Sequence, residues 1–197
     1  MRSIAKCFEV PALLTATALL AASGAVGQQA ASRAPRLAAA VYSASGELAW
    51  PADTDRWVVL GTSLGSDYAE GAFDPANPGT IGVVQIEPSA YAQVLKTGTY
   101  ADGTMLLLTF YRAETQSEPQ LRGFVQGAVR GREIHVLDRQ RFSAEGRAFF
   151  VFPGETKSAA PMPLGSECVR CHSEHGRLDA TFAQFYPPLR HFVQARQ

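Results

Sequence analysis

Hydrophobic and polar residues alternate through the middle of the chain in the two-residue period of β-strands. The run from Thr104 to Arg112 shows the period most clearly. It places Leu106, Leu108 and Phe110 on one face and Met105, Leu107 and Thr109 on the other. Similar runs follow at Gly123 to Val129, Glu133 to Asp138 and Arg147 to Phe152. Together these four runs predict an antiparallel meander.

Shorter elements are expected on either side of the meander. Trp57 to Gly61 is typical of a first strand or the end of a helix, and Ile81 to Ile86 predicts a strand. Pro88 to Lys96 predicts a short helix, because proline suits the first helical turn and Gly98 can end it. The predicted fold class is α+β: a mainly antiparallel β-sheet with a few short helices.

The amino-terminal end has the order of a secretory signal. Two basic residues, Arg2 and Lys6, precede an apolar run from Ala12 to Ala22, and small residues continue to Gly27. This order predicts cleavage and a periplasmic protein. The expected organisation is a signal peptide over 1–27, a flexible leader over 28–49, and a single domain over 50–197.

The net charge of the chain does not point to a particular class of partner. Loss of the signal changes Lys plus Arg from 18 to 16 and Asp plus Glu from 18 to 17. A net charge near −1 does not indicate binding to nucleic acid. No later stretch has the roughly 20 apolar residues that a membrane-spanning helix needs. We therefore expect neither a nucleic-acid partner nor a membrane span.

The chemistry of the chain is concentrated at Cys168-Val169-Arg170-Cys171-His172. This pattern is the c-type haem attachment motif. On a helix, the two thiols lie about one turn apart on one side, where they can bond the two vinyl groups of a porphyrin. The adjacent imidazole of His172 then becomes the proximal ligand of the iron. We expect one covalent haem c per chain, on a haem-bearing helix near the C-terminus.

The cysteine pair has two other possible roles. An exported pair could form a disulfide or a redox site, but a redox Cys-x-x-Cys belongs at a strand-to-helix junction and this one lies near the carboxyl end. A structural zinc site needs four ligands, and only His175 and His191 could complete it. The haem interpretation is favoured over both.

The sixth position of the iron is expected to be open. No methionine follows His172, and Met105 and Met162 both precede the motif. His135 and His191 are possible ligands, although a lone histidine is more often structural. A last, proline-interrupted helix is expected over Phe182 to Gln194.

The stretch from Cys168 to Arg190 resembles the cytochrome P-460 family, which includes the cytochromes c′-beta. Three more stretches agree with that family in the same order: Trp57 to Thr62, Thr97 to Thr104 and Asp138 to Phe142. The resemblance covers most of the chain after Trp50. It implies a sheet-rich fold, a homodimer, five-coordinate haem ligated by histidine, and a periplasmic location.

Two functions occur on that scaffold, and the resemblance bears on both. Members that oxidise hydroxylamine carry a crosslink from a lysine to the porphyrin, whereas the c′-beta members lack it and bind NO and CO. The position of the crosslinking lysine is Leu108 here. After processing the chain keeps two lysines, Lys96 and Lys157, which are expected on the short helix and in the loop after the meander.

The resemblance also suggests residues around the haem. Glu133 matches a carboxylate that moves protons above the iron, although it could equally pair with Arg130 or Arg132 at the surface. Phe73 and Tyr100 are candidates for aromatic caps on the distal face, with core packing as the alternative. Arg141 and Arg190 are candidates to contact the propionates or to lie near the proximal histidine; simple solvation is the alternative.

The leading hypothesis is a protein that binds a diatomic gas in an apolar distal pocket. The second is an enzyme that oxidises hydroxylamine or a similar small nitrogen compound with Glu133 as catalytic base. The third is an electron-transfer cytochrome. The expected partners are a small gas or nitrogen compound and a redox partner protein, and the electron-transfer hypothesis differs from gas binding in requiring a filled sixth iron position.

Overall fold

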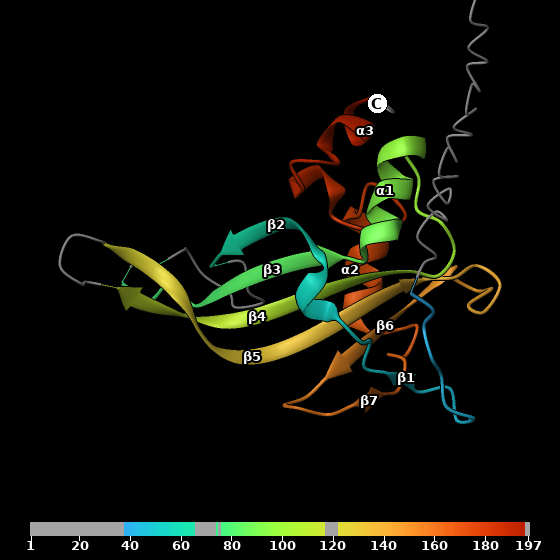
Figure 1. Ribbon diagram of the computed structural model, residues 1–197, viewed down its shortest axis with the longest axis horizontal. Coiled ribbons are helices and arrows are strands. Elements are labelled where there is room, and N and C mark those ends of the chain that lie inside the picture. Colours follow the sequence, from blue (N-terminus) through green and yellow to red (C-terminus); the bar gives the residue numbers. More distant parts are fainter. Residues whose placement is uncertain (1–37, 66–73, 75, 117–121, 196–197) are drawn as a thin grey trace, which may run out of the picture. The chain divides into compact units, whose positions relative to one another are not determined.

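The computed structural model describes residues 38–65, 74, 76–116 and 122–195, and its centre is a five-stranded antiparallel sheet. The strands lie in chain order, each paired with the next, as Figure 1 shows. They are β2 (Val58–Leu64), β3 (Thr80–Ile86), β4 (Thr104–Gln116), β5 (Gly123–Leu137) and β6 (Arg147–Phe152). The predicted α+β class and the antiparallel meander are confirmed.

Short elements flank both faces of this sheet (Figure 1). A two-stranded antiparallel ladder joins β1 (Leu48–Ala49) to β7 (Ser158–Ala159). The α-helices are α1 (Pro88–Thr97), α2 (Glu167–His175) and α3 (Arg190–Gln194); η1 (Thr54–Arg56) and η2 (Ala183–Phe185) are single 3₁₀ turns. In the described part of the chain, no helix is long and apolar enough to cross a membrane.

The alternation predicted for β4 separates two hydrophobic clusters. Met105 and Leu107 are buried with β1, β7 and the large rings of β6 on one face of the sheet. Leu106 is buried on the opposite face, against α1, α3 and the segment after α2. Successive side chains of a strand point to opposite faces. The sheet therefore has a hydrophobic cluster on each face, and the site described below lies on the face of Leu106.

Helix α1 begins and ends as its sequence predicts. The carboxylate of Glu87 accepts hydrogen bonds from the backbone N–H groups of Ser89 and Ala90 at 3.0 and 2.9 Å, which caps the free donors of the first turn. Gly98 then takes the left-handed conformation that ends many helices (φ 70°).

Three elements differ from the prediction. β5 continues through Arg130 and Arg132, because pairing with β4 extends to both sides of Gly131. Within the predicted leader, Leu48 is fully buried and belongs to β1, so the folded part of the chain begins before residue 50. The expected last helix is divided into η2 and α3 by Pro187 and Pro188.

Candidate functional site

A cavity of about 520 Å³ opens on the sheet face that carries α2. Its volume lies within the usual range of cofactor and ligand sites. Its walls come from β2 to β6, from α2, and from the segment around η2. The lining residues are Gly61, Thr62, Ser63, Val84, Leu106, Leu108, Phe110, Glu133, His135, Phe149, His172, Thr181, Phe182, Phe185 and Tyr186.

Cross-strand register arranges the floor of the cavity in rows. Val84 pairs with Leu108, and Leu108 pairs with Glu133. One step along the strands, Leu106 pairs with His135, and His135 pairs with Phe149. Directly opposed residues keep their side chains close on one face. The floor therefore has two polar side chains, both from β5, within an otherwise apolar surface.

Helix α2 carries the attachment motif. Cys168 and His172 are four residues apart and Cys171 lies between them, so all three share one side of the helix. Both cysteines are free thiols and half-buried. Burial raises the pKa of the Cys168 thiol, and the nearby charge of Glu133 raises it further, so the thiol stays protonated at neutral pH.

The imidazole of His172 is held in the tautomer that a metal ligand needs. Nδ1 lies 2.7 Å from the backbone oxygen of Ala180, and because a carbonyl can only accept, Nδ1 donates. Burial lowers the pKa of His172, which keeps the ring neutral. Nε2 is then the nitrogen with a free electron pair. The residues present fit a haem whose iron is bound by His172.

Aromatic rings enclose the imidazole of His172. The centroids of Phe149 and Phe182 each lie 4.7 Å from it, and His135 makes an edge contact at 5.7 Å. His135 is also stacked on Phe149 at 4.2 Å. Its Nε2 is buried and, among the described residues, has no hydrogen-bond partner. Burial lowers the pKa of His135 well below its usual value, so this second imidazole is neutral.

Glu133 is the carboxylate of the cavity. Burial raises its pKa. The structure does not pair it with Arg130 or Arg132: within the described residues Glu133 makes no ion pair, and Arg132 instead packs over the ring of Trp50 at 4.4 Å. A carboxyl group without a partner in an apolar cavity is suited to exchange protons.

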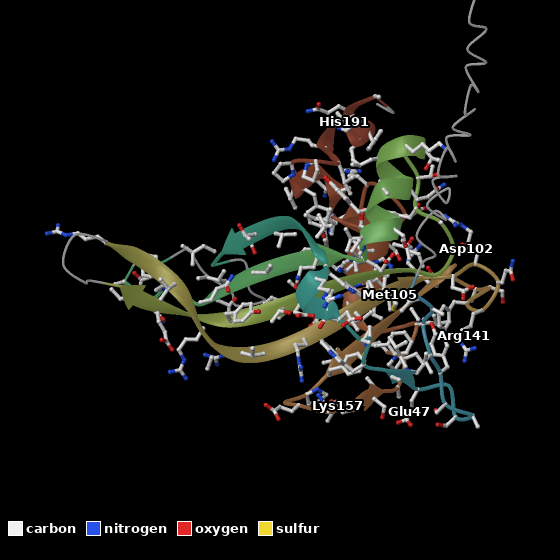
Figure 2. The ribbon with its side chains drawn as sticks, in the orientation of Figure 1. Glu47, Asp102, Met105, Arg141, Lys157 and His191 are labelled. Carbon is white, nitrogen blue, oxygen red and sulfur yellow. The ribbon has the colours of Figure 1, made fainter. Side chains whose placement is uncertain are left out.

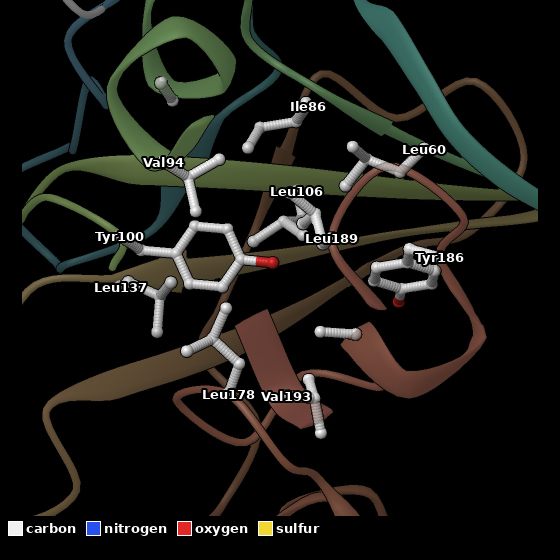
Figure 3. Close-up of a cluster of buried hydrophobic side chains, with 12 residues drawn as sticks. Leu60, Ile86, Val94, Tyr100, Leu106, Leu137, Leu178, Tyr186, Leu189 and Val193 are labelled. Atoms are coloured by element: carbon white, nitrogen blue, oxygen red, sulfur yellow. The ribbon is translucent and has the colours of Figure 1, made fainter. Parts of the chain in front are cut away.

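Two residues suggested for the haem environment lie elsewhere. Tyr100 is buried in the hydrophobic cluster, where its ring lies among Val94, Leu137 and Leu178 (Figure 3), and it does not line the cavity. Arg141 is exposed at the surface (Figure 2), with its guanidinium 3.7 Å from the centre of the Tyr42 ring. Both corrections have the same cause: local sequence does not reveal which distant element a side chain meets.

Other predicted residues can also be placed. Phe73 lies outside the described residues. Leu108 lines the cavity, as expected. Arg190 donates to the backbone oxygen of Gln184 at 3.2 Å and is exposed. His191 lies on α3, with its ring against Phe192 (Figure 2).

The lysines and methionines of the described part do not line the cavity. Lys96 is exposed on α1, and Lys157 is exposed just before β7 (Figure 2). Met105 is buried in the core on the opposite face of the sheet, and Met162 lies in the loop before α2. Besides His172, the cavity wall contains one other nitrogen ligand for a metal, His135.

Sequence reasoning did not single out Phe149 or Arg147 as parts of the site. Phe149 is next to Phe150, and period-two alternation of β6 places only one of them on the cavity face. Arg147 donates to the hydroxyl oxygen of Ser173, directly after His172, at 2.9 Å. Its positive charge contributes to the lowered pKa of His172. Contacts between distant elements of this kind have no local signal.

A sheet-supported cavity into which a Cys-x-x-Cys-His helix presents a neutral imidazole defines a haem-binding cytochrome. The chain belongs to the cytochrome P460 family, whose sequence model matches residues 51–183, a range that includes the whole sheet and the attachment motif. A search among curated proteins finds no match.

Proposed function

We propose that the mature protein is a periplasmic cytochrome that carries one covalent haem c per chain and binds a diatomic gas, NO or CO. In this proposal Cys168 and Cys171 form the thioether bonds, His172 is the fifth iron ligand, and the sixth position is open. The single observation that carries the proposal is His172 itself. Its Nδ1 is committed to Ala180, so Nε2 remains for iron in an otherwise largely apolar cavity.

The composition of the cavity wall favours gas binding over the other functions. Val84, Leu108 and Phe110 offer a small uncharged molecule an environment that excludes water, which would compete for the iron. Leu108 occupies the position at which the hydroxylamine-oxidising relatives are expected to carry a crosslinking lysine. Lys96 and Lys157 lie outside the cavity and cannot replace it without rearrangement of the fold.

Bound haem would supply the iron site for the gas, and the chain's own residues would control access to it. Leu108 and Phe110 are half-buried because they face the cavity rather than a neighbouring element. His172 would hold the iron from one side, with its ring fixed between Phe149 and Phe182.

Absorption and electron paramagnetic resonance spectra of the haem-loaded protein test this function. We expect high-spin, five-coordinate iron in the reduced protein and a new spectrum on addition of CO or NO. A low-spin, six-coordinate spectrum in both redox states would contradict the proposal and favour electron transfer. If His135 were the cause, His135→Phe would convert that spectrum to the high-spin form.

Glu133 supports a second candidate function, the oxidation of hydroxylamine or a similar small nitrogen compound. Its carboxyl group is in the cavity, lacks a partner among the described residues, and has a raised pKa. As catalytic base it would accept a proton from the N–H or O–H group of the substrate. The electrons would leave through the bound haem to a redox partner protein.

Steady-state turnover distinguishes this candidate from gas binding. With hydroxylamine and an artificial electron acceptor, an oxidase would turn over and Glu133→Gln would lose most of the rate, about 10²-fold or more for a general base. A gas-binding protein would show no turnover in either form but would still bind CO.

We also propose that the protein is exported and forms a homodimer. Export accounts for the order of charged, apolar and small residues over 1–27, and sequencing of the mature amino terminus tests it, with cleavage near Gly27 expected. For the dimer, β5 provides an exposed apolar surface where it extends beyond β6 and is paired with β4 alone (Figure 1): Phe124, Val125 and Val129 are 37, 45 and 51% exposed.

A further inference from the structure

The turn that contacts His172 is unusual in its backbone. Asp179 and Ala180 both have positive φ angles, 47° and 56°, although neither is glycine. Thr181 donates its backbone N–H to the oxygen of Leu178 at 2.9 Å, which closes a tight turn of the type that needs two left-handed residues. Alanine rarely adopts this conformation, and such backbone persists only where its surroundings enforce it.

A three-way ion pair holds this turn from outside. Arg139, in the turn between β5 and β6, contacts the carboxylate of Asp102 at 2.7 Å and that of Asp179 at 3.0 Å. Asp102 belongs to the turn before β4. One guanidinium therefore ties together three connections that are distant in the sequence, and one of them is the turn that carries the Ala180 oxygen. A planar guanidinium with several donors suits such bridging better than an ammonium group.

The same turn is also held from inside. The Thr181 hydroxyl donates to the oxygen of Leu178 at 2.8 Å and lies 3.3 Å from the hydroxyl of Tyr100 in the buried cluster. At the end of α2, a side chain on Gly176 would come within 2.5 Å of the backbone of Ala180. The absence of a side chain there allows the turn to lie directly against the helix that carries His172.

We propose that Arg139 is a positioning residue that sets the strength of the proximal iron ligand through this turn. The ion pairs fix Asp179, Asp179 fixes the orientation of the Ala180 carbonyl, and that carbonyl accepts the Nδ1–H of His172. Such a hydrogen bond increases the basicity of the imidazole. A more basic ligand binds iron more strongly and favours the oxidised state. The inference rests on the proposed function in one respect: His172 must be the iron ligand.

Two variants break the ion pair with opposite changes of charge. Arg139→Gln removes a positive charge. Asp179→Asn removes a negative one and keeps a residue that tolerates positive φ. If the pair positions the turn, both variants lower the iron–histidine stretching frequency of the reduced protein and raise its reduction potential. The double variant then changes both properties no further than the single ones do, because the residues act as one unit.

The contrary results are distinct. If only long-range charge matters, the two variants shift the potential in opposite directions and leave the stretching frequency unchanged, which overturns the proposal. Arg141→Gln is the matched control: it removes the same charge from the same turn without touching Asp179, and we expect an unchanged stretching frequency. If the unmodified protein has no iron–histidine band, its reduced haem is not the five-coordinate histidine complex, and the proposed function fails together with this inference.

Discussion

At the scale of single residues, the site depends on two groups whose pKa values are shifted by burial. His172 is neutral because it is buried, and its hydrogen bond to Ala180 determines which nitrogen keeps the proton. Glu133 is a half-buried carboxyl without a partner among the described residues. Both shifts follow from the cavity and not from the residue types alone.

The sequence predicts some residues of the site and misses others. Cys168, Cys171 and His172 are found by their spacing, because one bound group dictates it. The sequence leaves His135 as either an iron ligand or a structural histidine, but it lies two residues after Glu133 and therefore shares its face of β5. Tyr100 follows the core-packing alternative, because an aromatic residue after a helix can pack in a core or line a cavity, and only the tertiary fold decides between them.

The raised pKa of Glu133 predicts a pH-dependent effect on stability. In the folded protein the proton is held more tightly than in the unfolded chain, so the free energy of unfolding falls as pH rises above 4.5, the ordinary pKa of a glutamate carboxyl group. We expect Glu133→Gln to leave stability nearly unchanged below this pH and to increase it progressively above, as the native carboxyl ionises.

Denaturant unfolding of both proteins from pH 4 to pH 8 measures the difference. If the free energies of unfolding of the two proteins differed by a constant amount across this range, ionisation of Glu133 would not be the cause of the pH dependence. Glu167→Gln provides the comparison, because Glu167 is exposed at the start of α2 and we expect its substitution to produce no such trend.

At the scale of elements, the sequence predicts the helices and strands that neighbouring residues determine. Helix α1 has its proline at the start and its glycine after the end, and β4 has strict alternation. The two-residue strands β1 and β7 could not be predicted, since each exists only because the other pairs with it across about 110 residues. The expected break in β5 is absent for a similar reason: partners on β4 carry the strand across Gly131.

The close contact between α2 and the turn after it requires a residue without a side chain at Gly176. In Gly176→Ala the new methyl group would meet the backbone of Ala180 and the oxygen of His172 at 2.5 Å, so helix and turn must separate. We expect a loss of about 2 kcal/mol in the free energy of unfolding, measured by denaturant titration of the haem-loaded protein.

Gly165→Ala is the matched substitution at the other end of the same helix. No atom lies within 4 Å of a side chain there, and the substitution should be close to neutral. Equal losses in the two variants would indicate a general cost of replacing glycine near α2 and would refute the role of this contact.

At the scale of the whole molecule, the two faces of the five-stranded sheet in the described domain differ in what they carry. The large rings of β6, Phe150 and Phe152, are fully buried with β1 and β7, away from the site. The face that carries α2 has both the cavity and a hydrophobic cluster of its own, which α1, α3 and the segment after α2 complete. The family and its fold class could be predicted from sequence, whereas the positions of the clusters and the cavity on the two faces depend on strand register.

The proposed homodimer is tested on the exposed part of β5. Val125→Glu combined with Val129→Glu places two charges on that surface, and we expect light scattering to give the mass of a single chain where the unmodified protein gives that of two. Leu164→Glu changes an equally exposed apolar residue outside the strand and should leave the dimer intact. If the unmodified protein were monomeric at all concentrations, the proposal of a homodimer would be contradicted.

The central proposal is that this chain holds its haem by covalent bonds at Cys168 and Cys171. The most direct test is the intact mass of the denatured mature protein, purified after expression with a cytochrome c maturation system. We expect the mass of the processed chain plus one haem, and loss of that addition in the variant with both cysteines changed to alanine. The mass of the bare chain, or one lower by two hydrogens as in a disulfide, would contradict it.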